Sequence, residues 1–387
     1  MAIYLDNNAT TAMDSRVTDV MLQSFQQGPA NPASQHALGR FARDQIEFST
    51  ESIGQSLGTQ LDQPGGPRLL FTSGGTESNN LALTGIASDG PLVVSRIEHP
   101  SIIEPALAAQ RSGRTVRWVK VDANGQICLQ SLEDAIRGDG KIASLVSIMS
   151  ANNETGVLQP IEEVVRICRH LGVPLHVDAT QSIGKVPLQL DELGAAAITF
   201  TAHKFHGPVG IGALWMRTGL KVEPLLYGGQ QQLESRPGTE PAALVIGMAK
   251  ALELAVSEME QSTQAVRVLR DRLETELLQR HDELVIHGAN SSRLPATSCL
   301  SFCGTDRQSM LMALDLAGIA CSSGSACSSG SSPPSHVLLA MGCPDEQVRS
   351  ALRFGLSKFS TIDEINKSIE LISNNYNRLR QLSAVDN

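Results

Sequence analysis

Short apolar runs alternate with longer amphipathic stretches between about residues 68 and 214. Runs of this length are typical of buried strands, and the longer stretches have the spacing of helices. Their alternation predicts an α/β domain with a mostly parallel sheet. The predicted strands are 69–72, 92–95, 115–119, 142–148, 174–177, 196–200 and 212–216.

The pattern changes after about residue 240, where apolar positions at helical spacing predict one long helix over 241–280. This helix would lead into a smaller α+β domain. We place the large domain at 14–255, and the small domain at 1–13 and 256–387. The elements expected in the small domain are strands at 284–287, 298–302 and 318–320, and helices near 309–316 and 363–379.

Composition narrows the class of protein. The chain has 387 residues, of which 41% are hydrophobic and 18% charged, as in ordinary folded proteins. Its net charge of −9, without a basic cluster, argues against nucleic acid and anionic membranes as partners. Seven cysteines and an N-terminus without a signal segment favour reduced thiols and a cytoplasmic location. We therefore expect a small-molecule or protein partner and no membrane span.

Residues 321–335 read CSSGSACSSGSSPPS and lack the large side chains that a core needs. We predict a mobile loop here, with Cys327 near its middle. A structural cysteine is normally buried among apolar groups, so a thiol between small residues is better suited to react with a substrate. Cys321 is a weaker candidate because it adjoins a predicted strand. The remaining cysteines show no metal-ligand spacing beyond the loose pair 299 and 303, and we expect no metal.

Lys204 is the candidate nucleophile among only eight lysines. A lysine taken at random is a surface residue. This one follows a predicted strand, and His203, His206 and several glycines surround it in the sequence. In such a turn a desolvated amine with a lowered pKa could form a Schiff base.

Polar residues also follow other predicted strands. Asp178 follows the run 174–177 and His99 follows 92–95, so both are expected at the carboxyl edge of the sheet, where α/β proteins bind ligands. Gly75 lies in a Gly-Gly turn that could expose N–H groups to a phosphate. Each has an ordinary alternative: a helix cap for Asp178, a structural histidine for His99 and a simple turn for Gly75.

Ten segments together resemble the cysteine desulfurases of the NifS/IscS type, which are fold-type I enzymes dependent on pyridoxal 5′-phosphate (PLP). The resemblance extends from one end of the chain to the other. The segments are 4–11, 31–36, 71–80, 98–101, 152–156, 176–185, 202–212, 236–240, 322–330 and 353–361.

The resemblance implies a role for each matching position. Lys204 would hold PLP as a Schiff base, Asp178 would pair with its pyridine nitrogen and His99 would stack on its ring. Arg353 would bind the substrate carboxylate, and Cys327 would take the sulfur. The other implied contacts are Gly75, Thr76, Thr201 and His203 with the cofactor, Asn153 and Gln181 with the cofactor or substrate, and Thr239 with the phosphate of the neighbouring subunit of a homodimer.

The activity implied is sulfur removal from L-cysteine, which gives L-alanine and a persulfide on Cys327. An acceptor such as an iron–sulfur scaffold protein would then take the sulfur. The Asn7-Asn8 pair and the short C-terminal end favour the NifS branch and leave the acceptor open. Two alternatives remain: a transaminase or β-eliminating lyase in which Cys327 is incidental, and an inactive binding partner in sulfur-transfer assemblies.

Overall fold

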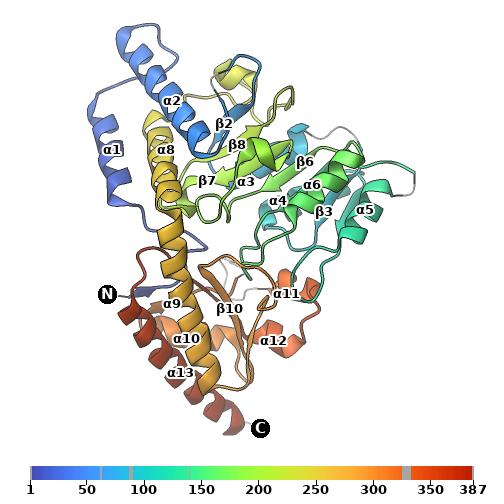
Figure 1. The fold of residues 1–387 in the computed structure, drawn as a ribbon, viewed down its shortest axis with the longest axis vertical. Helices are drawn as coiled ribbons and strands as arrows, with labels where there is room; N and C mark the ends of the chain where they lie inside the picture. The colour runs from blue at the N-terminus through green and yellow to red at the C-terminus, as the bar shows by residue number, and fades with distance from the viewer. Residues whose placement is uncertain (1, 62, 87–89, 139, 325–332, 386–387) are drawn as a thin grey trace.

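The molecule has an upper and a lower part, which two consecutive helices connect (Figure 1). Helix α8 (Ala242–Ser257) lies against the upper part, and α9 (Met259–Arg280) extends into the lower part. The helix predicted over 241–280 is therefore two helices, which separate at Glu258. The computed structural model describes residues 2–61, 63–86, 90–138, 140–324 and 333–385.

The upper part contains a seven-stranded sheet in the order β2-β8-β7-β6-β5-β3-β4. Strand β8 runs antiparallel to β2 and β7, whereas the other pairs in this sheet are parallel. The predicted α/β fold with a mostly parallel sheet is confirmed. The strands are β2 (Arg68–Thr72), β3 (Leu92–Ser95), β4 (Val116–Val119), β5 (Leu145–Met149), β6 (Leu175–Asp178), β7 (Ala197–Thr201) and β8 (Gly212–Met216).

Both faces of this sheet are buried. In β3, Val93 packs into one hydrophobic cluster, and its neighbours Leu92 and Val94 pack into another. Strands buried on both faces read as continuous apolar runs, which is why the sequence revealed them. Helices of the first cluster are α1 (Ser15–Gln26), α2 (Ala37–Ser56), α5 (Leu129–Arg137), α6 (Ile161–His170), α7 (Leu190–Leu193) and α8; those of the second are α3 (Gly75–Leu81), η1 (Ala82–Ile86) and α4 (Pro100–Arg111).

One strand begins later than predicted. The apolar run suggested 142–148, but β5 begins at Leu145, where it pairs with Leu92 of β3. Ile142 lies before the strand and is 46% exposed. An apolar run therefore located the strand but did not show where pairing with a neighbour starts.

The lower part combines a three-stranded antiparallel sheet, in the order β12-β10-β9, with a short parallel pair of β1 and β11. Strands β1 and β12 were not predicted. Its elements are β1 (Ile3–Tyr4), α9, β9 (Leu284–Ile286), β10 (Thr297–Phe302), α10 (Arg307–Leu316), β11 (Ile319–Ala320), α11 (His336–Ala340), α12 (Asp345–Ser350), β12 (Ala351–Gly355) and α13 (Ile362–Val385).

Two hydrophobic clusters follow the proposed division into 14–255 and 1–13 with 256–387, whereas a third joins Ile97 and Met149 to residues between Cys299 and Ala351. One cluster draws its buried residues from between Val17 and Leu254. Another combines Ile3 and Leu5 with residues between Val266 and Tyr376. We keep these boundaries as a proposal.

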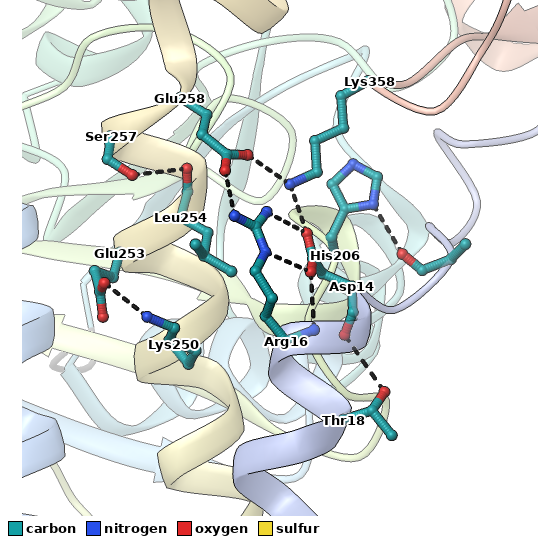
Figure 2. Close-up of polar contacts among 11 residues, drawn as sticks. Asp14, Arg16, Thr18, His206, Lys250, Glu253, Leu254, Ser257, Glu258 and Lys358 are labelled. Atoms are coloured by element: carbon teal, nitrogen blue, oxygen red, sulfur yellow. Dashed lines mark hydrogen bonds and ion pairs between the residues drawn. The ribbon is translucent and has the colours of Figure 1, made fainter.

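Four charged residues form a closed ring of ion pairs where α1, the α8–α9 break and the chain after β12 meet (Figure 2). We call Asp14, Arg16, Glu258 and Lys358 the junction cluster. Arg16 contacts Asp14 at 2.7 Å and Glu258 at 2.6 Å, and Lys358 contacts the same two carboxylates at 2.8 and 2.9 Å. The cluster therefore ties the start of α1 and the break between α8 and α9 to the lower part.

Candidate active site

The predicted site residues after four strands lie at one edge of the large sheet. Strand β6 ends at Asp178, and the 3-10 turn η2 (Ala202–Lys204) directly follows β7. His99 follows β3 as the N-cap of α4, and Gly75 begins α3 after β2. Since β2, β3, β6 and β7 run in the same direction, these residues meet at the carboxyl edge.

The Lys204 amine is half-buried and held by backbone carbonyls. Its Nζ donates hydrogen bonds of 2.6 Å to the carbonyl oxygens of both Asn8 and Ala9. Burial and the nearby Arg353 lower the Lys204 pKa to about 8, while Asp6 and Asp178 oppose the shift. A sizeable fraction of this amine is therefore uncharged near neutral pH, as a nucleophile requires.

The N-terminal segment fixes the turn that carries Lys204. Thr11 receives the backbone N–H of His206 on its hydroxyl at 2.8 Å, and that hydroxyl donates to the His203 carbonyl at 2.9 Å. His206 adopts a left-handed backbone conformation with φ 66°, which is uncommon outside glycine. Contacts on both sides of Lys204 thus hold a strained turn in place.

Asp178 accepts two hydrogen bonds from neutral donors. Its Oδ1 accepts from the Thr180 backbone N–H at 3.0 Å, and its Oδ2 accepts from Asn79 Nδ2 at 2.8 Å. The same Asn79 nitrogen donates to Ser101 Oγ at 2.8 Å. Asn79 and Ser101 were not predicted as site residues, although both lie in segments that carried the resemblance.

This network continues to His99. Its Nδ1 accepts the Ser101 backbone N–H at 3.1 Å and lies 2.8 Å from Ser101 Oγ. Because Nδ1 is an acceptor, the neutral ring carries its proton on Nε2. Burial lowers the His99 pKa, and Asp178 opposes the shift. His99 is therefore an uncharged ring with a fixed tautomer.

Two of the predicted phosphate contacts, Gly75 and Thr76, lie in the first turn of α3, and Thr201 lies beside Gly75. No side chain caps this helix, and the N–H groups of its first turn, at Gly75 and Thr76, have no partner within the helix. Burial and Lys204 lower the His203 pKa to about 4, so its ring is neutral. The Thr201 hydroxyl donates to the Ile211 carbonyl at 2.8 Å, and it would have to exchange this bond to donate to a phosphate.

The residues at this edge fit PLP. Two buried oxygens beside Asp178, Asn79 Oδ1 and Thr180 Oγ1, lack a hydrogen-bond partner in the described part of the chain. A Cβ added to Gly75 would lie 3.4 Å from Thr180 Oγ1, so the Gly-Gly turn lies next to one of these unpaired oxygens. A carboxylate for a pyridine nitrogen, an amine for an aldehyde and a helix start for a phosphate therefore occur together.

Arg353, the predicted carboxylate ligand, lies in the buried strand β12. Its Nη2 donates to Asp6 Oδ1 at 2.8 Å, and its Nη1 donates to the Asn153 carbonyl at 3.0 Å. Its buried Nε has no partner among the described residues. The pair with Asp6, which holds the guanidinium in position, was not predicted.

Gln181 connects the N-terminal segment to a second half-buried lysine. Its Nε2 donates to the Asn8 carbonyl at 3.0 Å, and its Oε1 accepts from Lys185 Nζ at 3.1 Å. Burial lowers the Lys185 pKa to about 7, and the charges of Lys204 and Arg353 add to the shift. The scarcity of lysine could have singled out Lys185.

Two predicted residues are not placed at this edge. Cys327 lies outside the described residues. Thr239 is exposed, and its predicted contact is with the phosphate of the neighbouring subunit. Burial raises the pKa of Cys321 to about 12, which makes it a poor competitor. No group of three metal-binding side chains occurs in the described ranges.

Comparisons with known proteins agree with this geometry and confirm the resemblance. The Aminotransferase class-V family model matches residues 3–367. A cysteine desulfurase IscS from Dictyoglomus turgidum is 38% identical over 386 residues, which cover 98% of this chain and 96% of that protein.

Two solved structures have similar folds. A NifS-like protein from Rickettsia africae has a TM-score of 0.89 at 33% identity, covering 97% of this chain and 100% of its own. A structure titled SspA in complex with cysteine has a TM-score of 0.79 at 29% identity, covering 92% and 99%. The chain therefore belongs to the class-V aminotransferase family, as a PLP-dependent enzyme of the NifS/IscS cysteine desulfurase type.

Proposed function

We propose that the protein removes sulfur from L-cysteine, releases L-alanine and keeps the sulfur as a persulfide on Cys327. The observation that carries the proposal is the meeting of Lys204, Asp178 and His99 at one sheet edge. Lys204 is held by carbonyls rather than by a carboxylate. The solved relative with bound cysteine supports the choice of substrate.

When bound, PLP supplies an electron-withdrawing ring that stabilises negative charge beside the substrate's amino group. Asp178 would hold the pyridine nitrogen, with its own position set by Asn79. His99 would cover the ring face, and its Nε2–H would be available to donate. Arg353 would bind the substrate carboxylate with the bidentate geometry for which a guanidinium is suited.

Lys204 would act as the base that takes the proton from the substrate's α-carbon, because its lowered pKa suits proton transfer near neutral pH. The Cys327 thiolate would then attack the substrate sulfur. An S–S bond forms, the C–S bond breaks, and its electron pair stays with the carbon skeleton. That carbon gains a proton, so cysteine and one thiol give alanine and one persulfide.

A cysteine variant tests this step. Cys327→Ser should lower alanine formation from L-cysteine by about 10²-fold or more, because the nucleophile is lost. Cys303→Ser is the control, since that half-buried thiol lies in the lower part beside Tyr376. Unchanged alanine and sulfide production in Cys327→Ser would contradict the proposal and favour a lyase.

Exposed aromatic side chains of the upper part support a homodimer. Phe25 on α1, Phe48 on α2 and Tyr227 are 64%, 70% and 91% exposed. Apolar surface of this kind marks interaction sites, and exposed Thr239 would reach the other subunit. Phe48→Glu should therefore yield monomers in light scattering and weaken PLP binding. A fully dimeric variant would argue against α2 as part of the interface.

We further propose a cytoplasmic location and a protein acceptor, such as an iron–sulfur scaffold, for the persulfide sulfur. The acidic net charge of −9 and the free thiols outside the site support this assignment. Within the described ranges, no helix combines the length and apolar character needed to cross a membrane. Transfer of labelled sulfur from the persulfide to a purified scaffold would test the acceptor.

A further inference from the structure

One buried carboxylate accepts a hydrogen bond just after the segment that contains Cys327 and lies close to the residue just before it. Glu154 is only 3% exposed, and its Oε2 accepts a hydrogen bond from Ser335 Oγ at 2.5 Å. Ser335 follows the segment and caps α11 through the Leu338 N–H. At the preceding end, a Cβ added to Gly324 would lie 2.8 Å from the same Glu154 oxygen.

The turn that carries Glu154 is fixed to the large sheet. Asn152 Oδ1 accepts the backbone N–H groups of Glu154 and Thr155 at 3.0 and 2.9 Å. Asn152 Nδ2 in turn donates to the Ile97 carbonyl at 3.0 Å, just before His99. The carboxylate is therefore a rigid point on the same edge that holds the cofactor residues.

Other contacts bring the two ends to the substrate side of the site. The backbone of Ser322 pairs with that of Arg353, with N–O distances of 3.2 and 2.6 Å. After the segment, His336 Nε2 lies 2.9 Å from the Glu98 carbonyl, next to His99. The segment thus starts beside the predicted carboxylate ligand and ends beside the predicted ring-stacking histidine.

Glycine at position 324 agrees with this close approach. Its φ of +83° lies in the left-handed region that favours glycine, and any side chain would collide with the Glu154 carboxylate. The backbone at Gly324 can therefore lie close to the Glu154 carboxylate because this position has no side chain.

We propose that Glu154 is a positioning residue that holds both ends of segment 325–332 against the site, so that Cys327 meets the substrate sulfur. This inference rests on the proposed function. Holding the ends reduces the conformations that the intervening chain must sample. Changing Glu154 should therefore slow sulfur transfer and leave cysteine binding unchanged, since the proposed mechanism includes no contact between Glu154 and the substrate.

Two substitutions separate the hydrogen bond from side-chain volume. Glu154→Met keeps an unbranched side chain of similar size but cannot accept the Ser335 hydroxyl. Glu154→Gln keeps an acceptor and should restore most of the function. Ser335→Ala removes the same bond from the other side, together with the α11 cap. Asp306→Ala, which removes the N-cap of α10 through the Ser309 N–H, controls for the loss of a cap alone.

The measurements are made on the holoenzyme. Half-saturation of the cysteine-induced absorbance change reports binding, and mass spectrometry after one turnover gives the rate at which Cys327 gains sulfur. Hydrogen exchange of peptides covering 318–324 and 333–341 reports whether both ends are held. Cys327→Ser is included, because continued sulfur transfer in that variant would reject the proposed function itself.

In Glu154→Met and Ser335→Ala, sulfur transfer should slow about tenfold, because small displacements of reacting groups cost rate steeply. The cysteine concentration at half-saturation should stay within about twofold of the parent value, and hydrogen exchange should rise at both ends of the segment. Glu154→Gln and Asp306→Ala should transfer sulfur at nearly the parent rate. The proposal would be overturned if folded Glu154→Met transferred sulfur at the parent rate. It would also be overturned if hydrogen exchange rose at neither end, or if cysteine binding weakened as much as sulfur transfer.

Discussion

The carboxyl edge of the large sheet and the junction cluster differ in how their charged side chains are paired. At the edge, the Lys204 amine faces two backbone carbonyls, and no ion pair of Lys204 occurs among the described residues. In the junction cluster, each charged group meets two of opposite sign, and Arg16 and Lys358 bridge the same carboxylates.

The pKa shifts follow from this difference. Burial without an ion pair, together with the nearby charge of Arg353, brings the Lys204 pKa down to about 8, near the pH at which it would transfer protons. In the junction cluster, hydrogen bonds from Arg16 and Lys358 lower the Glu258 pKa to about 2, and those from Arg16 keep that of Asp14 well below its usual range. Unpaired burial thus prepares a group for chemistry, whereas pairing fixes its charge for structure.

The largest effect should follow from removing the unpaired amine. Lys204→Ala should abolish the visible absorption of the bound cofactor and lower turnover about 10³-fold or more, because both the Schiff-base amine and the base are lost. Lys250→Ala is the control, since Lys250 lies on α8 and pairs with exposed Glu253. A Lys204→Ala enzyme with the parent spectrum would remove Lys204 from the site.

A smaller effect should follow from changing the donor to Asp178. Asn79→Ala removes the hydrogen bonds to Asp178 and Ser101, and a bond to a charged group is worth enough to weaken PLP retention about tenfold. Asn80→Ala is a matched control, since that amide donates to Thr76 within its own helix. Equal PLP dissociation constants in both variants would contradict a role for Asn79.

The two half-buried lysines of the site, Lys185 and Lys204, should make stability depend on pH. In the unfolded chain they stay protonated to about pH 10.4, whereas the folded pKa values are about 7 for Lys185 and about 8 for Lys204. Between these values the unfolded chain holds more protons, so the unfolding free energy of the apoenzyme should rise as pH increases from about 7 to 10.

Lys185→Met sharpens this test, because it removes one of the two titrating amines. Urea unfolding of the apoenzyme at several pH values should show a flatter rise than in the parent protein. Identical slopes in the two proteins would mean that Lys185 keeps an ordinary pKa when folded.

The smallest effect should come from the junction cluster. Lys358→Met should cost about 1 kcal/mol of stability, as expected for a partly exposed network, and leave turnover within about twofold. Because the folded pKa values of Asp14 and Glu258 are lowered, their stabilisation is present above about pH 4 and is lost as pH falls toward 2. Acid unfolding should therefore begin at a higher pH in Lys358→Met than in Lys250→Met.

Much of the large sheet was predictable because strands buried on both faces are short apolar runs. The break at Glu258 was not, since the residues on both sides keep a helical pattern and the partners of Glu258, Arg16 and Lys358, are distant in the sequence. Strand β12 was missed because it carries Arg353, whose burial depends on distant Asp6 and Asn153.

The residues of the site were also predictable only in part. Residues at or shortly after strand ends, such as Asp178 and Lys204, could be found from the alternation of elements. Their partners could not, because Asn79 and the Asn8 carbonyl reach them from 99 and 196 residues away in the chain. Local patterns locate reactive groups, whereas the groups that orient them depend on the tertiary fold.

The most direct test of the central claim is one turnover of the holoenzyme with isotopically labelled L-cysteine, followed by mass spectrometry of every cysteine peptide. We expect one labelled sulfur atom on Cys327 and one equivalent of L-alanine. Alanine formation with the label on Cys321 or another thiol, or on none, would contradict the claim that Cys327 receives the sulfur.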